Sequence, residues 1–159
     1  MVYPGTCLME GTNLSEGRGT AKPFLNVGAP WIDEEWLARS LNELQLPGTK
    51  FLATRFIPTQ SKFMGQTCGG VEIHVIDRTR FRPVSGAIEL LRALRSKYPK
   101  EFQWNRDHFD RLSGSSQLRL AIDQGQSTHE IILDWQYHLK EFEQKRQKFL
   151  LYPGSSVGP

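Results

Sequence analysis

The sequence predicts an α+β domain, in which a small mixed or antiparallel sheet carries several packed helices and the C-terminal half is helical. Two patterns indicate this class. Apolar residues alternate with polar ones in runs before residue 78, whereas from residue 85 onward they recur every three or four positions. Strands that precede helices, rather than alternating with them, favour α+β. A length of 159 residues suits one domain with a single core.

The N-terminal third is predicted to consist of a strand, an irregular stretch and a helix. Residues 2–9 are predicted to form a strand that leads into a glycine-bearing loop, and residues 17–30 contain several prolines and glycines typical of irregular backbone. Asp33 is a suitable N-cap for the helix, which Pro47 ends. The apolar residues at helical spacing within it are Trp36, Leu37, Leu41 and Leu44.

Two further strands are predicted before residue 78. The first, residues 51–57, ends at Pro58, and the second, residues 70–77, has the clearest alternation. Successive side chains of a strand point to opposite faces, so the apolar and the remaining side chains of residues 70–77 are predicted to lie on opposite faces. One face carries Val71, Ile73 and Val75, and the other carries Glu72, His74 and Ile76.

Helices are predicted from Ser85 onward. Ser85 is the predicted N-cap of a helix that Pro99 ends, and short helices are predicted at residues 107–112 and 116–123. The apolar stripe of the first of these helices consists of Ile88, Leu91, Leu94 and Tyr98.

The last helix has the strongest start signal. Ser127 and Glu130 have the spacing of a capping box. Apolar residues continue one face of this helix toward Phe149, and Trp36 and Trp135 are both predicted to be core residues. We predict a single domain at residues 1–152 and a disordered tail at residues 153–159. The residues of this apolar face are Ile131, Trp135, Leu139 and Phe142.

A segment rich in functional side chains runs from residue 3 to residue 20. It combines a carboxylate, hydroxyls, an amide and a guanidinium with four glycines, a mixture for which core packing has no use. Glycine allows backbone to approach a ligand closely, and the polar groups supply acid/base and hydrogen-bonding chemistry. The candidate site residues are Glu10, Thr12, Asn13, Ser15 and Arg18.

Residues 3–20 also resemble a known pattern. Their sequence, Y-P-G-T-C-L-M-E-G-T-N-L-S-E-G-R-G-T, is similar to the opening of the C-terminal half of NamZ-type exo-β-N-acetylmuramidases, glycosidases of bacterial cell-wall recycling. Further matches follow in order along nearly the whole chain, among them Gly28-Ala29-Pro30-Trp31-Ile32-Asp33, Cys68-Gly69-Gly70-Val71 and His74-Val75-Ile76-Asp77-Arg78. Together these ordered motifs are far more specific than any one of them.

The resemblance implies a function and a missing partner. A chain of this family would be the C-terminal part of a glycosidase that hydrolyses terminal β-linked N-acetylmuramic acid from peptidoglycan fragments. A Rossmann-like domain precedes it in such enzymes, so this chain alone is expected to be incomplete and to be inert or nearly so. The resemblance also implies the bacterial periplasm, cell envelope or secretion as its location. A non-catalytic module that binds muramyl sugars or peptidoglycan is the alternative.

Glu10 is the predicted catalytic residue, because glycoside hydrolysis needs a carboxyl group beside the scissile bond. The other interpretation is a carboxylate that holds loop amides. Thr12, Asn13 and Ser15 are predicted to bind sugar hydroxyls or the N-acetyl group, or else to form turns with their own backbone.

Arg18 and His74 complete the predicted substrate-binding set. Arg18 has a guanidinium that suits the lactyl carboxylate of N-acetylmuramic acid, although a salt bridge to Glu16 is an equal alternative. His74 is predicted either to line the pocket beside Glu72 or to be a satisfied strand histidine. Trp31 is the tryptophan with the best claim to stack on a sugar, and Lys62 is either a pocket residue or solvated.

Composition excludes several other classes. The net charge of +3 is spread along the chain, so no nucleic acid partner is expected. No apolar run approaches the ~18 residues that span a membrane. The four histidines lack metal-ligand spacing, and no cofactor is expected. Cys7 and Cys68 are predicted either to pair in an oxidising compartment or to be free thiols.

Overall fold

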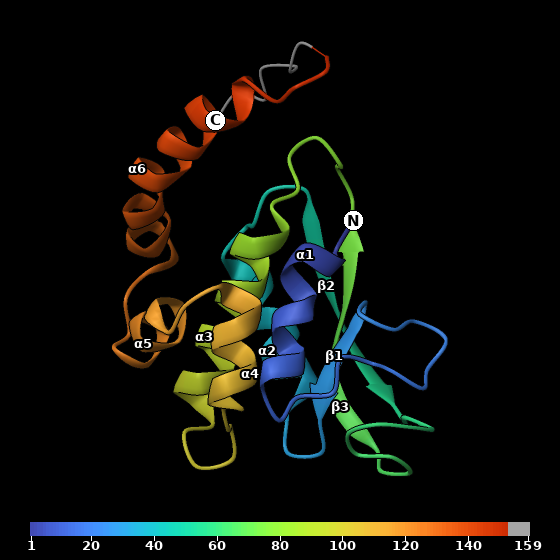
Figure 1. Cartoon of the computed structure of the whole chain (residues 1–159). Helices are drawn as coiled ribbons and strands as arrows, with labels where there is room; N and C mark the ends of the chain where they lie inside the picture. Colours follow the sequence, from blue (N-terminus) through green and yellow to red (C-terminus); the bar gives the residue numbers. More distant parts are fainter. Residues whose placement is uncertain (153–159) are drawn as a thin grey trace. The chain divides into compact units, whose positions relative to one another are not determined.

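The computed structural model describes residues 1–152 and contains two compact units (Figure 1). The first unit comprises residues 1–125 and holds the sheet, five α-helices and one 3₁₀ helix, while the second begins at Gln126 and holds one long helix. The single-domain boundary at residue 152 stays a prediction. The tail predicted at residues 153–159 lies outside the described residues.

Three antiparallel strands form the sheet, in the order β1-β3-β2. They are β1 (Asn26–Ala29), β2 (Thr49–Phe56) and β3 (Cys68–Val75). Phe51 lies opposite Ile73 and both are buried, whereas Glu72 and His74 are only partly buried on the other face. The alternation predicted for residues 70–77 is therefore confirmed in β3. The sheet is antiparallel rather than mixed.

Two helices pack on the buried side of the sheet. Helix α2 (Glu34–Glu43) contacts β2 and β3, and α3 (Pro83–Lys97) contacts α2 (Figure 1). Asp33 caps α2 as predicted, with its side chain accepting the Trp36 N–H at 2.9 Å. The predicted cap of α3 is wrong. Arg82 is the N-cap, and the helix begins at Pro83 because the fixed φ of proline and its missing N–H suit the first turn.

The predicted N-terminal strand is also wrong. Residues 3–11 form a short helix, α1 (Tyr3–Thr6), followed by a 3₁₀ helix, η1 (Cys7–Gly11). Close packing explains the helix. A Cβ on Gly5 would lie 2.0 Å from the Pro83 carbonyl oxygen, so α1 can approach α3 only with glycine there. Leu8 and Met9 are buried at the end of this segment.

The two short helices predicted after residue 100 are confirmed as α4 (Arg106–Ser113) and α5 (Gln117–Asp123). Helix α4 packs on η1 through Phe109, which is fully buried. At this contact a Cβ on Gly11 would come within 2.5 Å of the Phe109 Cα. The segment that carries Glu10 is therefore fixed by α4.

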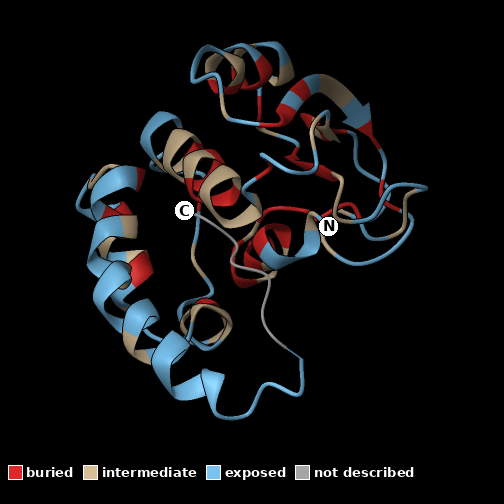
Figure 2. Cartoon of the chain, turned by 90° about the horizontal axis from the view of Figure 1, so that it is seen from above, coloured by how far each residue is buried: buried red, intermediate tan, exposed pale blue. Residues whose placement is uncertain are grey.

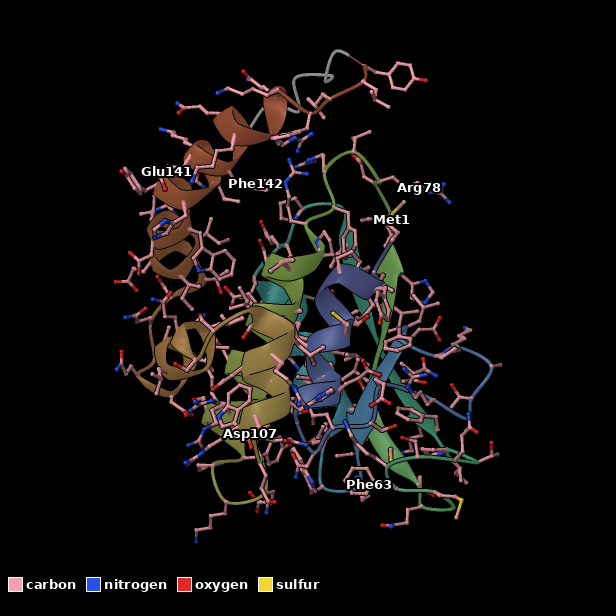
Figure 3. The ribbon with its side chains drawn as sticks, viewed as in Figure 1. Met1, Phe63, Arg78, Asp107, Glu141 and Phe142 are labelled. Carbon is pink, nitrogen blue, oxygen red and sulfur yellow. The ribbon has the colours of Figure 1, made fainter. Side chains whose placement is uncertain are left out.

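The second unit consists mainly of α6 (Thr128–Gln147). Its capping box is confirmed, with the Ser127 N–H donating to Glu130 at 2.7 Å. Its apolar face is not a core stripe. Ile131 is buried, but Leu139 and Phe142 are 48% and 60% exposed, and Figure 2 shows most of the helix as exposed. Phe142 projects from the helix in Figure 3. Helical spacing identifies an apolar face, but it does not show what covers that face.

Among residues 1–152, no helix has both the length and the apolar character needed to cross a membrane.

Candidate functional site

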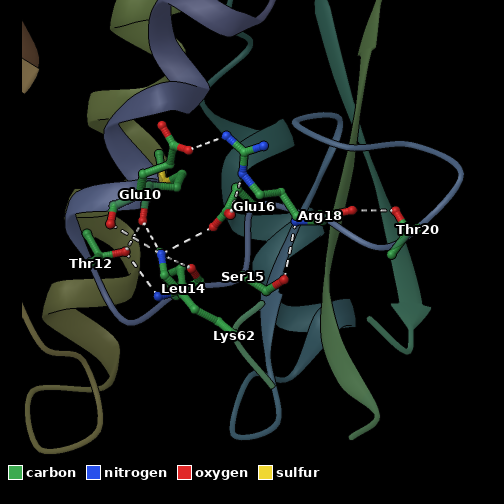
Figure 4. A network of polar contacts seen from close by, with 10 residues as sticks. Glu10, Thr12, Leu14, Ser15, Glu16, Arg18, Thr20 and Lys62 are labelled. Carbon is green, nitrogen blue, oxygen red and sulfur yellow. Dashed lines mark hydrogen bonds and ion pairs between the residues drawn. The ribbon is translucent and has the colours of Figure 1, made fainter. Parts of the chain in front are cut away.

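The candidate site is a chain of alternating charges that joins three segments (Figure 4). Glu10, on η1, accepts a hydrogen bond from Arg18 Nη2 at 2.5 Å. Arg18 Nε lies 3.2 Å from Glu16 Oε1, and Lys62 Nζ lies 3.2 Å from Glu16 Oε2. The turn around Arg18 depends on Gly17 and Gly19, which both have positive φ. The Arg18 guanidinium thus bridges the carboxylates of Glu10 and Glu16, and the Lys62 ammonium group binds Glu16 as well.

Glu16, which is buried, and Lys62, which is partly buried, form the base of this network. The Glu16 side chain is 3% exposed. Burial lowers the pKa of Lys62 from its ordinary value, and the opposite charge of Glu16 counteracts part of this shift. Besides Glu16, the ammonium group donates to three backbone carbonyls, those of Met9, Leu14 and Glu10, at 3.0, 2.8 and 3.3 Å. Lys62 is therefore neither simply solvated nor free to reach a ligand.

Arg18 and Glu10 form the part of the network that meets solvent. Their side chains are 44% and 20% exposed. The hydrogen bond to Glu10 raises the pKa of Arg18 further above its ordinary value, so the guanidinium is always charged. Its Cζ lies 4.8 Å from the centroid of the Phe24 ring. The salt bridge to Glu16 leaves part of the guanidinium exposed. The two partners predicted for Arg18, Glu16 and a sugar carboxylate, can therefore be bound at the same time.

Thr12, Asn13 and Ser15 bind backbone in this structure. The Thr12 hydroxyl donates to the Met9 carbonyl at 2.8 Å, and Ser15 Oγ accepts the Gly17 N–H at 3.2 Å. The Asn13 amide donates to one carbonyl and accepts one N–H of residues 101–103, at 2.8 and 2.9 Å. Their roles in sugar binding stay predictions. The turn-forming interpretation describes the contacts of Thr12 and Ser15, whereas Asn13 joins the loop to the distant segment 101–103.

His74 belongs to a second polar cluster, on the face of the sheet opposite α2. His74 Nε2 lies 2.7 Å from Glu72 Oε1, and Lys22 Nζ donates to the same oxygen at 2.6 Å. Glu72 and His74 therefore lie on the same face of β3, as the alternation predicts. Within residues 1–152, no contact joins this cluster to Glu10 or Arg18, and a pocket role for His74 stays a prediction.

This second cluster gives a test of acid stability. The hydrogen bond from Lys22 holds the pKa of Glu72 below its usual value, so the stabilisation is present above the unfolded pKa and is lost as pH falls through the folded pKa. We expect Glu72→Gln to lower the unfolding free energy by about 0.5 kcal/mol at pH 7 and by less at pH 3, in urea titrations. Glu43→Gln, at an exposed position, is the control; an equal loss for Glu72→Gln at both pH values would contradict the expectation.

Sequence reasoning missed two aromatic residues beside Arg18. Tyr3 and Phe24 form an edge-to-face pair with ring centroids 4.8 Å apart. The sequence places Tyr3 in a predicted strand and Phe24 in a predicted irregular stretch. Trp31, the predicted sugar platform, instead lies 5.1 Å from the Tyr98 ring, which also contacts Trp36. A signal for Phe24 was its closeness to the glycine-rich turn.

Other reactive groups lie apart from this network. Cys7 and Cys68 are free thiols, and burial raises the pKa of Cys68 to about 11, so it is a poor nucleophile. No group of three or more potential metal ligands is found in the part of the chain that the structure describes. A surface hollow of about 260 Å³ lies between the end of α2 and β2, and neither Glu10 nor Arg18 lines it.

The chain matches a known protein family. Residues 1–152 match the family model described as exo-β-N-acetylmuramidase NamZ, C-terminal. A curated Bacillus subtilis (strain 168) protein, peptidoglycan β-N-acetylmuramidase NamZ, is 42% identical over 152 residues. The match covers 95% of this chain and 37% of that protein. This chain therefore spans little more than a third of the length of its curated relative.

Two crystal structures of DUF1343 family proteins from Bacteroides fragilis NCTC 9343 share the fold. One has a TM-score of 0.85 and 26% identity, covering 96% of this chain and 41% of that one. The other, at 24% identity, has a TM-score of 0.71 and covers 97% of this chain and 40% of that one, so it bears on the fold alone. With the family model matching nearly the whole chain, this protein belongs to the family of NamZ exo-β-N-acetylmuramidase C-terminal domains.

Proposed function

We propose that this chain is the C-terminal part of an exo-β-N-acetylmuramidase, which releases terminal β-linked N-acetylmuramic acid from peptidoglycan fragments. The observation that carries the proposal is the Glu10–Arg18 pair, which is partly exposed and is joined through Arg18 to the buried Glu16 and its partner Lys62. A carboxylate and a guanidinium fixed side by side at a surface are suited to bind and orient an acidic sugar.

Each member of the pair has a distinct role in this proposal. Arg18 donates through Nη2 to Glu10, and its Nε lies 3.2 Å from Glu16 Oε1 in an ion pair, while Nη1 has no protein partner within residues 1–152. Nη1 is therefore available to the lactyl carboxylate that distinguishes N-acetylmuramic acid from N-acetylglucosamine. Glu10 acts as general acid/base or positions the sugar.

A further domain is proposed to complete the site. The curated relative extends well beyond the matched segment, and glycoside hydrolysis commonly needs a second carboxyl group. We propose that a preceding Rossmann-like domain supplies this group and the other wall of the pocket. Pockets between domains are a common arrangement.

A non-catalytic module that binds muramyl sugars is the second candidate. It is favoured by the fact that both carboxylates of the network already have cationic partners. Such a module needs the Arg18 guanidinium but no proton transfer by Glu10. It predicts affinity without turnover.

The test measures release of N-acetylmuramic acid from a chromogenic β-N-acetylmuramide. The protein is assayed alone and joined to the part of the B. subtilis relative that precedes the matched segment. We expect turnover by the joined protein, and a loss of at least about 100-fold in kcat/KM for its Glu10→Gln variant. Glu43→Gln, with an exposed side chain, should leave kcat/KM unchanged.

Two results would contradict the proposal. Absence of turnover by a folded joined protein, under conditions in which the B. subtilis protein is active, would reject the hydrolase and favour the binding module. Equal activity of the Glu10→Gln and Glu43→Gln variants would reject the role of Glu10.

A further inference from the structure

Three side chains from two segments meet at the Phe24 ring, and one of them, Arg18, also binds Glu10. Tyr3 comes from α1, and Arg18 and Phe24 come from the loop before β1. The Arg18 guanidinium lies over the Phe24 ring, at 4.8 Å from its centroid, and the Tyr3 ring meets Phe24 edge to face at the same separation. Phe24 thus holds both a cation and a second aromatic ring.

The backbone at Phe24 is held in a conformation that is unusual for this residue type. Its φ is +64°, in the left-handed region that bulky residues rarely adopt. A hydrogen bond from the Phe24 N–H to the Glu16 carbonyl, 2.6 Å long, fixes this conformation. Such strain persists only where surrounding contacts enforce it, and it often occurs at binding sites. The Phe24 ring therefore has a defined position beneath Arg18.

Exposure distinguishes the three side chains. Tyr3 is 53% exposed and the Arg18 side chain 44% exposed, whereas Phe24 is partly buried. A sugar ring has an apolar face of C–H groups that packs on aromatic rings, and a sugar acid also needs a cationic donor. Both requirements are met here within one small area, with Tyr3 as the open ring and Arg18 as the donor.

We propose that Tyr3, Phe24 and Arg18 form a platform that binds an amino sugar bearing a carboxylate. Tyr3 packs on the apolar face of the sugar, Arg18 Nη1 binds the carboxylate, and Phe24 is a positioning residue that holds the guanidinium. The inference rests on the proposed function for the identity of the sugar. It adds that selectivity for the acidic sugar depends on Phe24 as well as on Arg18.

The test is a binding titration of the 159-residue chain, in which NMR signals of the protein are monitored as sugar is added. N-acetylmuramic acid and N-acetylglucosamine are the two probes. We expect the Tyr3 ring and Arg18 Nε signals to shift with the acidic sugar. Tyr3→Ala should weaken binding of both sugars about tenfold, while Tyr3→Phe retains it. Phe24→Leu should weaken binding of N-acetylmuramic acid more than that of N-acetylglucosamine. Tyr137→Ala, at an exposed tyrosine of α6, should change neither affinity.

The same variants in the joined protein provide the second measurement, through KM for the chromogenic muramide. If neither affinity nor KM responds to Tyr3→Ala, the platform is rejected. A lower melting temperature of the joined protein with unchanged KM would identify Tyr3 as a domain contact and also reject it. Tyr3-dependent binding without turnover would support the platform while rejecting the hydrolase, so the two proposals fail separately.

Discussion

Replacing Lys62 by methionine is expected to lower the free energy of unfolding by about 3–5 kcal/mol. The variant keeps the apolar stem but leaves the Glu16 carboxylate, which is 3% exposed, without its ammonium partner. It also leaves the Met9 and Leu14 carbonyls without the donor that they have now. Burial already lowers the pKa of Lys62, so the loss arises from the groups left unpaired rather than from a strongly favourable ion pair.

Urea unfolding at pH 7 measures this effect. Lys100→Met, at an exposed position, is the matched control and should stay within about 0.5 kcal/mol of the parent protein. Adding Glu16→Gln to Lys62→Met should recover part of the loss, because the second change removes the unpaired charge. A loss below 1 kcal/mol for Lys62→Met alone would show that water replaces the ammonium group.

Gly11→Ala is expected to cost about 3 kcal/mol of unfolding free energy, because the added methyl group has no space. A Cβ on Gly11 would lie 2.5 Å from the Phe109 Cα and 2.8 Å from its nitrogen, and backbone cannot move aside as a flexible side chain can. Relief requires η1 and α4 to separate, which moves Glu10 at the same time.

Gly86→Ala is the matched control for this substitution. Gly86 lies inside α3, and a Cβ there meets no atom within 4 Å. Alanine is the better helix former, so this variant should gain about 0.5–1 kcal/mol. Thermal and urea unfolding of both variants measure the difference. If the two substitutions had effects of the same sign and size, the close approach of η1 to α4 would not be a determinant of stability.

Local signals in the sequence were sufficient for much of the fold. Asp33 and Ser127 cap their helices as predicted, because a cap depends on neighbours three residues away. The alternation in β3 also predicted its two faces. The strand predicted at residues 2–9 failed because a short run of mixed residues does not separate strand from helix, and the close approach that favours the helix comes from Pro83, far along the chain.

The site was less predictable than the fold. Glu10 and Arg18 were candidates by residue type, but no local pattern indicated that one guanidinium would bridge two carboxylates. The partners of Lys62 lie more than forty residues before it in the sequence, so its default interpretation was a solvated lysine. Likewise, the pairing of Tyr3 with Phe24 arises from tertiary packing alone.

The strand order of the sheet also affects when its strands can pair during synthesis of the chain. The central strand, β3, is the last of the three in sequence, so β1 and β2 have no hydrogen-bonded neighbour in the sheet until residues 68–75 have been synthesised. Until then Val27 and Phe51 lack the residues opposite them, and contacts of such long sequence separation form slowly. On a translating ribosome, β2 therefore stays unpaired until β3 emerges, and β1 can pair only through Gly28 with Ser15, so both strands are open to pairing with other chains.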